Sequence, residues 1–493
     1  MGEKFEVHNP ATGDLVATYP AHDEADVAAA VARARVGASW WSELGFAARR
    51  DYLARWNAVL TRRIAQLADI SHEETGKPHA DAQLEIVLAI DHLAWAGKHA
   101  AKVLGPRRVS SGVLMLNQAA TVEYRPLGVV GVIGPWNYPV FTPMGSIAYA
   151  LAAGNAVVFK PSEYSPGVGV WLAETFAEIV GHDVFQVVTG LGPTGAALGR
   201  AGVDKLAFTG STATGKKVMA TCAETLTPVV IEAGGKDAII VDADADVPAA
   251  VDAALWGAMS NAGQTCIGME RAYVHERVYD EFVREIAARA RAVSARPGGL
   301  LGPITMPSQV GVIRAHVQDA VNRGASFVVG SPESVGDRFV QPIVLTDVPE
   351  DALAVREETF GPTLTVKKVA SMQEAVALTN ATPYGLGASV FSKTRGVELA
   401  RQVRSGMAAV NSVISFAAVP ALPFGGVGDS GFGRIHGADG LREFTYAKAI
   451  TRQRMKPPLP TLTFARKART DKLVVAAMRV LFGRAKARST ERA

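Results

Sequence analysis

Short apolar runs rich in β-branched residues alternate with helical segments between residues 129 and about 232, and this alternation constrains the fold more than any other feature. Strands that are apolar along their whole length are typical of parallel sheets buried on both faces, and helices usually connect such strands. The chain therefore predicts an α/β fold with a parallel sheet covered by helices. The predicted strands are 129–133, 156–159, 184–189, 205–208 and 229–232, and the predicted helices are 144–153, 195–201 and 215–223.

The length of 493 residues predicts about three domains, at roughly 100–200 residues per domain. An Ala-rich helical stretch over 25–100, interrupted near 75–78, precedes the alternating region. A second α/β stretch runs from 236 to about 406. Hydrophobic residues make up 48% of the chain and charged residues 20%, as in ordinary globular proteins, so we expect a sizeable core in each domain.

The net charge of +4 is divided unevenly along the chain. Residues 451–493 contain 12 Lys and Arg against 2 Asp and Glu and carry +10, which leaves −6 on the 450 residues before them. This tail begins with an extended Pro-rich linker at 457–460 and continues with a predicted amphipathic helix over 471–488. Basic amphipathic helices can lie on anionic membranes, so peripheral membrane contact is one interpretation of this tail. Docking on a neighbouring subunit and a disordered solubilising tail stay open as alternatives.

The chain has two cysteines, Cys222 and Cys266, too few for a disulfide framework. Its first residues contain no apolar stretch of the kind found in a secretory signal, and no apolar run reaches the ~18 residues of a membrane span. These features favour a reducing cytoplasm. Because the basic charge is confined to the tail, we expect no nucleic-acid partner, and we expect no metal site.

Three segments that follow predicted strands are candidates for holding a dinucleotide. Residues 190–195 match G-x-G-x-x-G, but no acidic residue lies ~20 positions downstream, so an ordinary turn stays open. Residues 208–215, FTGSTATG, place Ser211 as the N-cap of a helix whose first N–H groups could hold a pyrophosphate; a capped helix without a ligand is the alternative. Lys160 and Glu163 could bind ribose hydroxyls, and the carboxylate would favour NAD over NADP, although a surface turn would need neither.

Three other residues are candidates for chemistry. Cys266 ends a loop of small and polar residues, 261–266, which favours an accessible thiol over a buried small hydrophobe. Glu232 ends an apolar strand beside two glycines, at the edge of a parallel sheet where ligands bind, and a partly buried carboxylate can act as a general base. Asn137 lies in the segment 135–139, and its amide could donate to a developing oxyanion; a proline-bracketed turn is the alternative.

Taken together, these segments resemble the aldehyde dehydrogenase superfamily. The resemblance extends from about Asn9 to Tyr446, most of the chain, and one late motif with Arg434 leans toward the fatty-aldehyde branch. Two departures are Ala233, where the family usually has Leu, and the absence of the Lys that many members carry in the late glycine motif. The motifs occur in the family's order, PWNYP, KPSE, FTGSTATG, IEAGGK, GQTC, EETFGP and PFGG with SGFGR.

The resemblance implies a role for each matching residue. Cys266 would be the nucleophile, Glu232 the general base, and Asn137 the oxyanion donor together with the backbone N–H of Cys266. Water activated by Glu232 would hydrolyse the thioester and release a free acid, because branches that transfer the acyl group to coenzyme A lack this base. The cofactor would be NAD or NADP. Its expected contacts are Trp136, Lys160, Glu163, Gly210, Ser211, Gly215, Glu358 and Phe360.

The resemblance also implies a Rossmann-like cofactor domain, an α/β catalytic domain and a small β extension for oligomerisation. A chain of this kind would form a homodimer or homotetramer. The expected ranges are 1–107 and 127–234 for the NAD-binding domain, 235–427 for the catalytic domain, 108–126 and 428–450 for the oligomerisation extension, and 451–493 for the basic tail.

The segments expected to line the aldehyde tunnel are 136–145, 256–269 and 411–424, and none contains Lys or Arg. A semialdehyde that bears a carboxylate would need a cation there. The sequence therefore favours an uncharged, hydrophobic aldehyde over a substrate such as succinic semialdehyde. Two other functions stay open, a cofactor-independent esterase that uses the same thiol and a non-catalytic scaffold. The presence of all three chemical residues argues against the scaffold.

Overall fold

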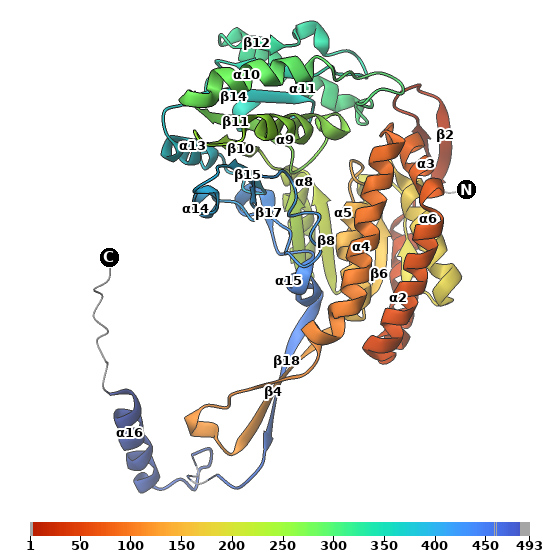
Figure 1. Cartoon of the computed structure of the whole chain (residues 1–493). Coiled ribbons are helices and arrows are strands. Elements are labelled where there is room, and N and C mark those ends of the chain that lie inside the picture. The colour runs from red at the N-terminus through yellow and green to blue at the C-terminus, as the bar shows by residue number, and fades with distance from the viewer. Residues whose placement is uncertain (1–2, 458, 460, 484–493) are drawn as a thin grey trace. The chain divides into compact units, whose positions relative to one another are not determined.

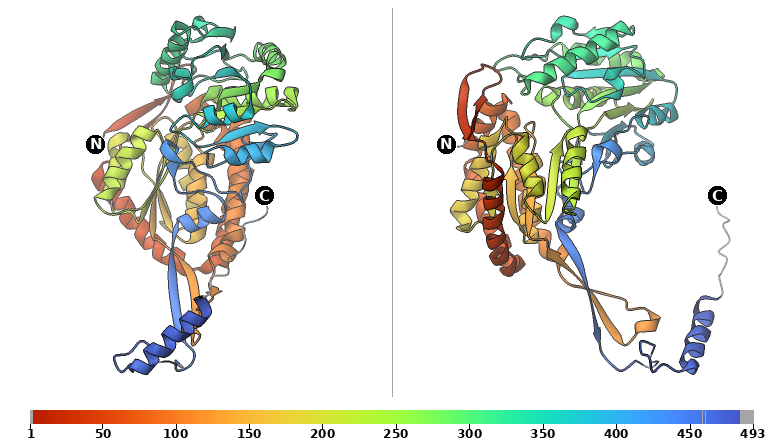
Figure 2. Two further views of the ribbon diagram at one scale, coloured as in Figure 1. Left: turned by 90° about the vertical axis from the view of Figure 1, so that its left-hand side faces the viewer. Right: turned by 180° about the vertical axis from the view of Figure 1, so that it is seen from behind.

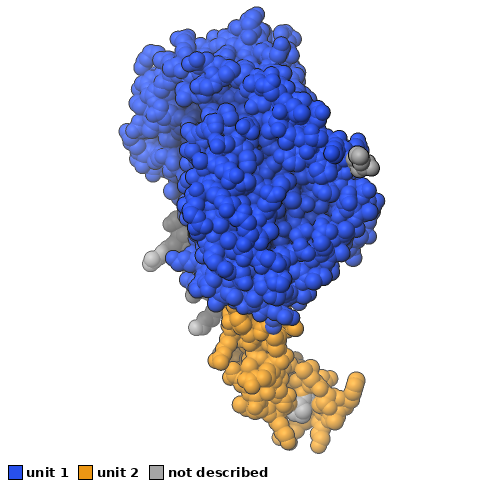
Figure 3. Space-filling view, turned by 90° about the vertical axis from the view of Figure 1, so that its right-hand side faces the viewer, with its two compact units in different colours: residues 1–104, 125–446 blue, residues 105–124, 447–493 orange. Residues whose placement is uncertain are grey.

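A computed structural model describes residues 3–457, 459 and 461–483. The chain divides into two compact units, the first formed by residues 1–104 and 125–446 and the second by 105–124 and 447–493 (Figures 1 and 3). Every residue predicted from the sequence to contact the cofactor or to take part in chemistry lies in the first unit. The site can therefore be described within that unit alone.

Helices occupy most of the first hundred residues and connect the strands after them (Figure 1). The helices are α1 Glu24–Glu43, α2 Gly45–Arg62, α3 Ile64–Thr75, α4 His79–Leu104, α5 Phe141–Ala153, α6 Pro166–Val180, α7 Gly192–Arg200, α8 Thr212–Ala223, α9 Val247–Met259, α10 Glu276–Ala290, α11 Pro307–Asn322, α12 Leu353–Arg356, α13 Met372–Thr379, α14 Gly396–Gln402, α15 Gly437–Glu443 and α16 Ala468–Phe482. The strands are β1 Lys4–His8, β2 Leu15–Pro20, β3 Arg107–Val109, β4 Gln118–Pro126, β5 Val129–Ile133, β6 Ala156–Lys160, β7 Phe185–Val187, β8 Lys205–Gly210, β9 Val229–Ala233, β10 Asp237–Val241, β11 Met269–His275, β12 Ser326–Val329, β13 Ile343–Thr346, β14 Thr363–Val369, β15 Ala388–Phe391, β16 Ala409–Val410, β17 Gly431–Phe432 and β18 Thr445–Gln453.

The predicted parallel sheet is confirmed as a six-stranded sheet in the order β17-β9-β8-β5-β6-β7. Its five strands from the alternating region pair in parallel, and the short β17 joins β9 antiparallel at one edge. Helices α1, α7 and α8 pack along one face, and α5 and α6 cover the other beneath α2, α3 and α4 (Figures 1 and 2). The carboxyl ends of β5, β8 and β9 therefore meet at one edge of the sheet, where ligands bind in such folds.

Local sequence signals account for where several of these elements begin and end. The hydroxyl of Ser211 accepts the N–H of Thr214 at 3.2 Å and caps α8 as predicted. Gly76 adopts a left-handed conformation with φ of +72° and separates α3 from α4, at the predicted interruption. Gly154 ends α5 in the same way before the chain enters β6.

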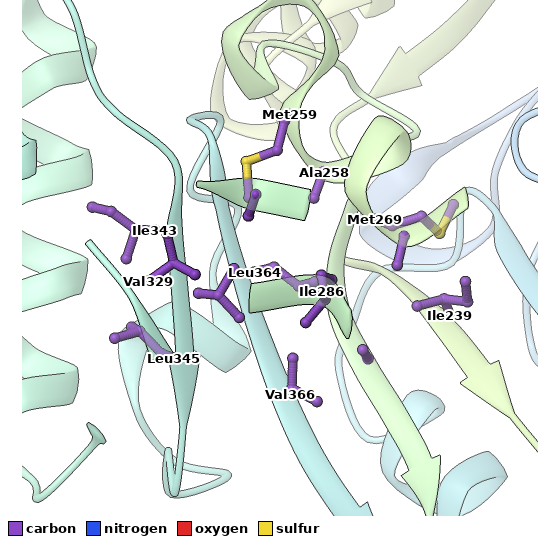
Figure 4. Close-up of a cluster of buried hydrophobic side chains, with 14 of the residues drawn as sticks. Ile239, Ala258, Met259, Met269, Ile286, Val329, Ile343, Leu345, Leu364 and Val366 are labelled. Carbon is purple, nitrogen blue, oxygen red and sulfur yellow. The ribbon is translucent and has the colours of Figure 1, made fainter. Parts of the chain in front are cut away.

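A second sheet of seven strands has the order β12-β13-β14-β11-β10-β15-β16 and is parallel except for β12. Its core is apolar and dry, and Ile239, Met269, Ile286 and Leu364 at its centre are fully buried (Figure 4). The chain passes from the first sheet to the second through only the three residues 234–236, between β9 and β10. This short passage places the end of β9 beside the second sheet.

The second unit contains β3 and most of β4 and β18, which form a three-stranded sheet in the order β18-β4-β3. The sequence-based division assigns 428–450 to this extension. In the structure the first part of that range, β17, pairs with Ile231 and Glu232 of the six-stranded sheet, because its backbone completes the edge beside β9. Within the range 428–450, only residues 447–450 belong to the second unit.

The predicted tail helix is present as α16, over the described part of its range. Residues 484–488 of the predicted helix, and Pro458 and Pro460 of the predicted linker, lie outside the described residues. Several large apolar side chains of α16 are exposed to solvent, including Val480 at 80% and Phe482 at 65%. No helix in the described ranges is both long enough and apolar enough to cross a membrane.

Candidate active site

Cys266 lies on a loop whose backbone is held in a left-handed conformation. After α9 the φ angles are +53° at Asn261, +55° at Ala262 and +73° at Gly263. A Cβ atom at position 263 would lie 2.1 Å from the carbonyl group of Gly361, so only glycine allows the loop to pass this close to its neighbour. The loop ends with the thiol of Cys266 partly exposed, whereas Cys222 is buried in α8.

The thiol of Cys266 donates a hydrogen bond to Oε1 of Glu232 at 3.4 Å. Burial raises the pKa of Glu232 to about 7, against the opposing effect of hydrogen bonds from Cys266 and Thr209. Burial also raises the pKa of Cys266, and the neighbouring carboxylate of Glu232 adds to that rise. At neutral pH the thiol is therefore protonated, and the carboxyl beside it is near its titration midpoint. A base with such a pKa is matched to chemistry near pH 7.

Asn137 lies between β5 and α5 and is buried beside the cysteine loop. Its side-chain Nδ2 donates to the backbone carbonyl of Gln264 at 2.9 Å. Its backbone carbonyl accepts from Nδ2 of Asn261 at 3.0 Å. These bonds hold a side-chain amide at the wall of the cavity that Cys266 also lines. A donor held in place before the reaction can stabilise an oxyanion without reorganisation. The structure thus brings the three residues predicted for chemistry to one place.

Two adjoining cavities form one groove along the carboxyl edge of the six-stranded sheet. The first has a volume of about 290 Å³ and reaches Cys266 and Glu358, and the second, of about 570 Å³, reaches Lys160. Gly192 and Gly195, from the predicted glycine-rich segment, line the second cavity. A groove of this extent at the start of α8 fits a dinucleotide, with the pyrophosphate near the helix N-terminus. Both cavities are lined by Trp136, Gly210 and Ser211.

Lys160 and Glu163 lie at the end of the groove that suits an adenosine. Nζ of Lys160 donates to the carbonyl of Pro161 at 3.1 Å and lies 3.8 Å from Oε2 of Glu163, and burial lowers the pKa of the lysine. Because an ammonium has three donors, this one can also bind ribose hydroxyls. Gly215 lines neither cavity. It belongs to the first turn of α8, on the side that packs against Ile231. Its place is in the packing of α8 on the sheet.

Glu358 and Phe360 lie on the loop between α12 and β14, at the other end of the groove. Oε1 of Glu358 accepts the backbone N–H of Gly235 at 3.1 Å, and the ring of Phe360 contacts the Trp136 indole edge-on with centroids 5.6 Å apart. Burial, followed by the charge of Glu270, raises the pKa of Glu358 to about 8. Its carboxyl is therefore largely protonated at neutral pH and can donate a hydrogen bond to a sugar hydroxyl.

A third cavity, of about 90 Å³, also reaches Cys266, and its wall is almost entirely apolar. The three segments predicted to line an aldehyde tunnel all contribute to its wall, with Tyr138, Phe141, Trp256, Ile414 and Phe424 among the residues. Neither Lys nor Arg lines it. Helix α4 supplies a further wall that the sequence did not predict, formed by Asp81, Leu84, Glu85 and Leu88.

Other residues at the site were also missed by the sequence analysis. Glu270 accepts the backbone N–H groups of Thr359 and Phe360 at 2.9 and 3.0 Å and pairs with Lys236, so it holds the Glu358 loop. An acidic residue at the start of an apolar strand was a signal that could have revealed it. Nothing local marks Met306, Gln309 and Val312, which also line the groove.

The two α/β sheets, the groove for a dinucleotide and the thiol at its end define a dinucleotide-dependent oxidoreductase as the class of protein. Residues 1–450 match the Aldehyde dehydrogenase family. The chain belongs to this family and is an oxidoreductase that acts on aldehydes with NAD or NADP. The resemblance and the fold class expected from the sequence are confirmed.

Relatives and solved structures of similar sequence cover nearly the whole chain. The 4,4'-diapolycopene aldehyde oxidase of Methylomonas sp is 38% identical over 91% of this chain and 86% of that protein. The glutarate-semialdehyde dehydrogenase of Pseudomonas aeruginosa is 34% identical over 91% of this chain and 94% of that protein.

Two of the similar solved structures are described with different cofactors, NAD in one and NADP in the other. The crystal structure of PnpE in complex with nicotinamide adenine dinucleotide has a TM-score of 0.87 at 31% identity, and the match covers 93% of this chain and 96% of that one. The crystal structure of an E. coli NADP dependent enzyme has the same TM-score and identity, over 92% of this chain and 95% of that one.

The charge of Glu232 should control the reactivity of the Cys266 thiol. Because the carboxylate raises the thiol pKa, Glu232→Gln should lower that pKa, increase the thiolate fraction and speed alkylation by iodoacetamide between pH 8 and 9 by roughly threefold or more. Mass spectrometry of the labelled peptides measures this rate. Cys222→Ser is the control and should leave the labelling rate of Cys266 unchanged. Equal rates in Glu232→Gln and the wild type would contradict the assignment.

Proposed function

We propose that the chain oxidises an uncharged, apolar aldehyde to the free carboxylic acid through a covalent adduct of Cys266. The single observation that carries this proposal is the hydrogen bond between the thiol of Cys266 and the carboxyl of Glu232, formed where the dinucleotide groove meets the apolar cavity. This oxidation needs a nucleophile, a base and an oxyanion donor, all next to a groove that binds the hydride-accepting cofactor.

The first step is the attack of the Cys266 sulfur on the aldehyde carbon. The thiol proton passes to Glu232, whose carboxylate already accepts the thiol's hydrogen bond, and the carbonyl oxygen becomes an oxyanion. One N–H of the Asn137 amide stays bound to the carbonyl of Gln264, and its second N–H donates to this oxyanion together with the backbone N–H of Cys266. Loss of one such donor typically slows a reaction by ~10²–10³.

The bound dinucleotide supplies the hydride acceptor that converts the adduct into a thioester. Trp136, Phe360 and Glu358 would hold its nicotinamide half beside Cys266, and Lys160, Glu163 and Ser211 would hold its adenosine and pyrophosphate half. Glu163 favours NAD, because a carboxylate near the ribose repels the 2′-phosphate of NADP.

Glu232 acts again in the second step, the hydrolysis of the thioester. After it has returned its proton to solvent, the carboxylate removes a proton from the attacking water, and the acid leaves as the thiol is restored. A pKa of about 7 lets the same group accept and release a proton near neutral pH. Release as the free acid, without transfer to coenzyme A, follows from the presence of this base.

A carboxylate-bearing semialdehyde is the second candidate substrate, because the glutarate-semialdehyde dehydrogenase of Pseudomonas aeruginosa is a relative. The apolar cavity favours the neutral aldehyde instead, since a buried carboxylate without a cation is costly. Another relative, the 4,4'-diapolycopene aldehyde oxidase of Methylomonas sp, is named for an aldehyde and not for a semialdehyde, which agrees with a neutral substrate. Ester hydrolysis by the same thiol, without cofactor, is a side reaction that the site allows.

Substitutions at the site should separate the two chemical steps. Cys266→Ala should abolish NAD reduction, and Glu232→Gln should slow turnover by ~10²–10⁴-fold, the usual contribution of a general base. The wild-type rate should rise with pH through about 7, since hydrolysis needs the unprotonated carboxylate, and this dependence should disappear in Glu232→Gln. Absorbance at about 340 nm follows NADH, whose nicotinamide supplies the signal. Cys222→Ser should behave as wild type; a fully active Cys266→Ala variant would end the proposal.

The apolar cavity should rank substrates by charge. A long-chain or aromatic aldehyde should have a kcat/KM at least about tenfold above that of succinic semialdehyde, because one uncompensated buried charge exceeds 1.4 kcal/mol. The panel is measured with NAD and with NADP in parallel. Phe424→Arg adds a cation to the cavity wall and should reduce the difference in kcat/KM between the two substrates. Preference of the wild type for the semialdehyde would refute the apolar assignment.

We further propose that the chain forms a homodimer or homotetramer in the cytoplasm and touches anionic membranes through its tail. The stretch 447–483 contains nine Lys and Arg against one Asp, beside the exposed apolar side chains of α16. This combination matches helices that lie on anionic lipid surfaces.

Vesicle flotation tests the proposed tail contact. The full chain should float with vesicles that contain phosphatidylglycerol and much less with phosphatidylcholine alone, and high salt should reduce the bound fraction. A chain that ends at Leu459 should not float with either vesicle. Light scattering of both chains gives their oligomeric states. Unchanged flotation after truncation, or loss of the oligomer without any vesicle binding, would refute membrane contact.

A further inference from the structure

A buried lysine–glutamate pair borders the apolar cavity, with Glu85 in the cavity wall. Lys77, between α3 and α4, pairs with Glu85 of α4, and each side chain is 1% exposed. Removing two charges from water costs several kcal/mol per ion, and such pairs often stabilise a fold no better than apolar residues would. The contacts of the pair therefore need an explanation other than stability.

Glu85 holds the segment that carries Asn137. Its Oε1 accepts the backbone N–H of Val140 at 2.7 Å and that of Phe141 at 3.0 Å, three and four residues after the amide. These N–H groups belong to the start of α5, where no side chain within the helix accepts them. The position of the oxyanion donor thus depends on a carboxylate from another helix.

Lys77 holds the other side of the site. Its Nζ lies 4.0 Å from the ring centroid of Tyr138, the residue next to Asn137, in a cation–π contact. The hydroxyl of Tyr138 lies 3.0 Å from Oγ1 of Thr265, the residue next to Cys266. The pair is therefore linked to both loops that carry the chemistry, each through one intermediate residue.

A second path connects the same region to the cysteine loop. The hydroxyl of Thr305 donates to the carbonyl of Thr75 at 2.7 Å, and the N–H of Thr305 donates to Oε1 of Gln264 at 2.8 Å. The backbone carbonyl of Gln264 is the group that accepts the amide of Asn137. Both paths therefore converge on the contact between Asn137 and the cysteine loop.

We propose that Lys77 and Glu85 are positioning residues that align the Asn137 amide with the Cys266 thiol for the reaction. This inference rests on the proposed roles of Asn137 and Cys266. It assigns to the pair a contribution to turnover that is separate from folding. Glu85 supplies the acceptor that places the Asn137 segment, and Lys77 neutralises that acceptor and orients Tyr138.

Two neutral double variants isolate the acceptor oxygen. K77M/E85Q keeps an oxygen for the N–H groups of Val140 and Phe141, whereas K77M/E85L removes it, and neither leaves a buried charge unpaired. Misplacement of a reacting group by about 1 Å can cost ~10²-fold, so kcat of K77M/E85L should fall by about 10- to 100-fold. That of K77M/E85Q should stay within about threefold of wild type, because neutral replacement of a buried pair is well tolerated. The Kd for NAD should be the same in the two double variants.

Glu74 offers a matched control at another helix. It is also a buried glutamate, and it accepts the N–H groups of Gly167 and Val168 at the start of α6, away from the cysteine loop. Glu74→Leu should lower the thermal midpoint as K77M/E85L does while leaving kcat per folded molecule unchanged. Circular dichroism gives the midpoint and, at the assay temperature, the folded fraction.

The outcomes separate positioning from mere stability. A kcat of K77M/E85L within about twofold of wild type, or an equal loss of kcat in Glu74→Leu, overturns the positioning role. Wild type and Cys266→Ala are assayed beside the variants. An inactive wild type, or an active Cys266→Ala, would instead overturn the proposed function, so the two failures are distinguishable.

Discussion

Buried glutamates that accept two consecutive backbone N–H groups recur where this fold needs a segment held in place. An N–H at the start of a helix or loop is costly when buried without a partner, and a carboxylate satisfies two of them at once. Two of the three glutamates pair with a buried lysine, which offsets the charge. The glutamates are Glu74 at α6, Glu85 at α5 and Glu270 at the loop that carries Glu358.

Low exposure to water also accounts for the acid–base character of the site. Burial is the largest cause of the raised pKa at Glu232, at Glu358 and at Cys266. The same burial strengthens any hydrogen bond that Asn137 offers to an oxyanion, because the local dielectric is low. A single property of the groove would thus poise Glu232 as the proposed base, keep the Cys266 thiol protonated at rest and make Asn137 effective as the proposed oxyanion donor.

Local patterns predicted the parallel sheet of residues 129–233 and the residues that meet at its edge, because strand periodicity, N-caps and the loop around Cys266 are encoded over a few positions. They did not predict Glu85 or Glu270, whose backbone N–H partners lie at least 55 and 89 residues away. Contacts of this kind are set by tertiary packing. Gly215 shows the opposite case, a motif residue expected at the cofactor that instead packs α8 against Ile231.

The cavity proposed for the aldehyde would treat the two ends of the proposed reaction differently. Its wall has no lysine or arginine, and the carboxylate of Glu85 in that wall is paired with Lys77. A neutral aldehyde would enter such a space without charge, whereas the acid formed from it would become an anion with no cation beside it. In the proposed reaction the product would therefore be bound less well than the substrate, so departure of the acid would need no moving part.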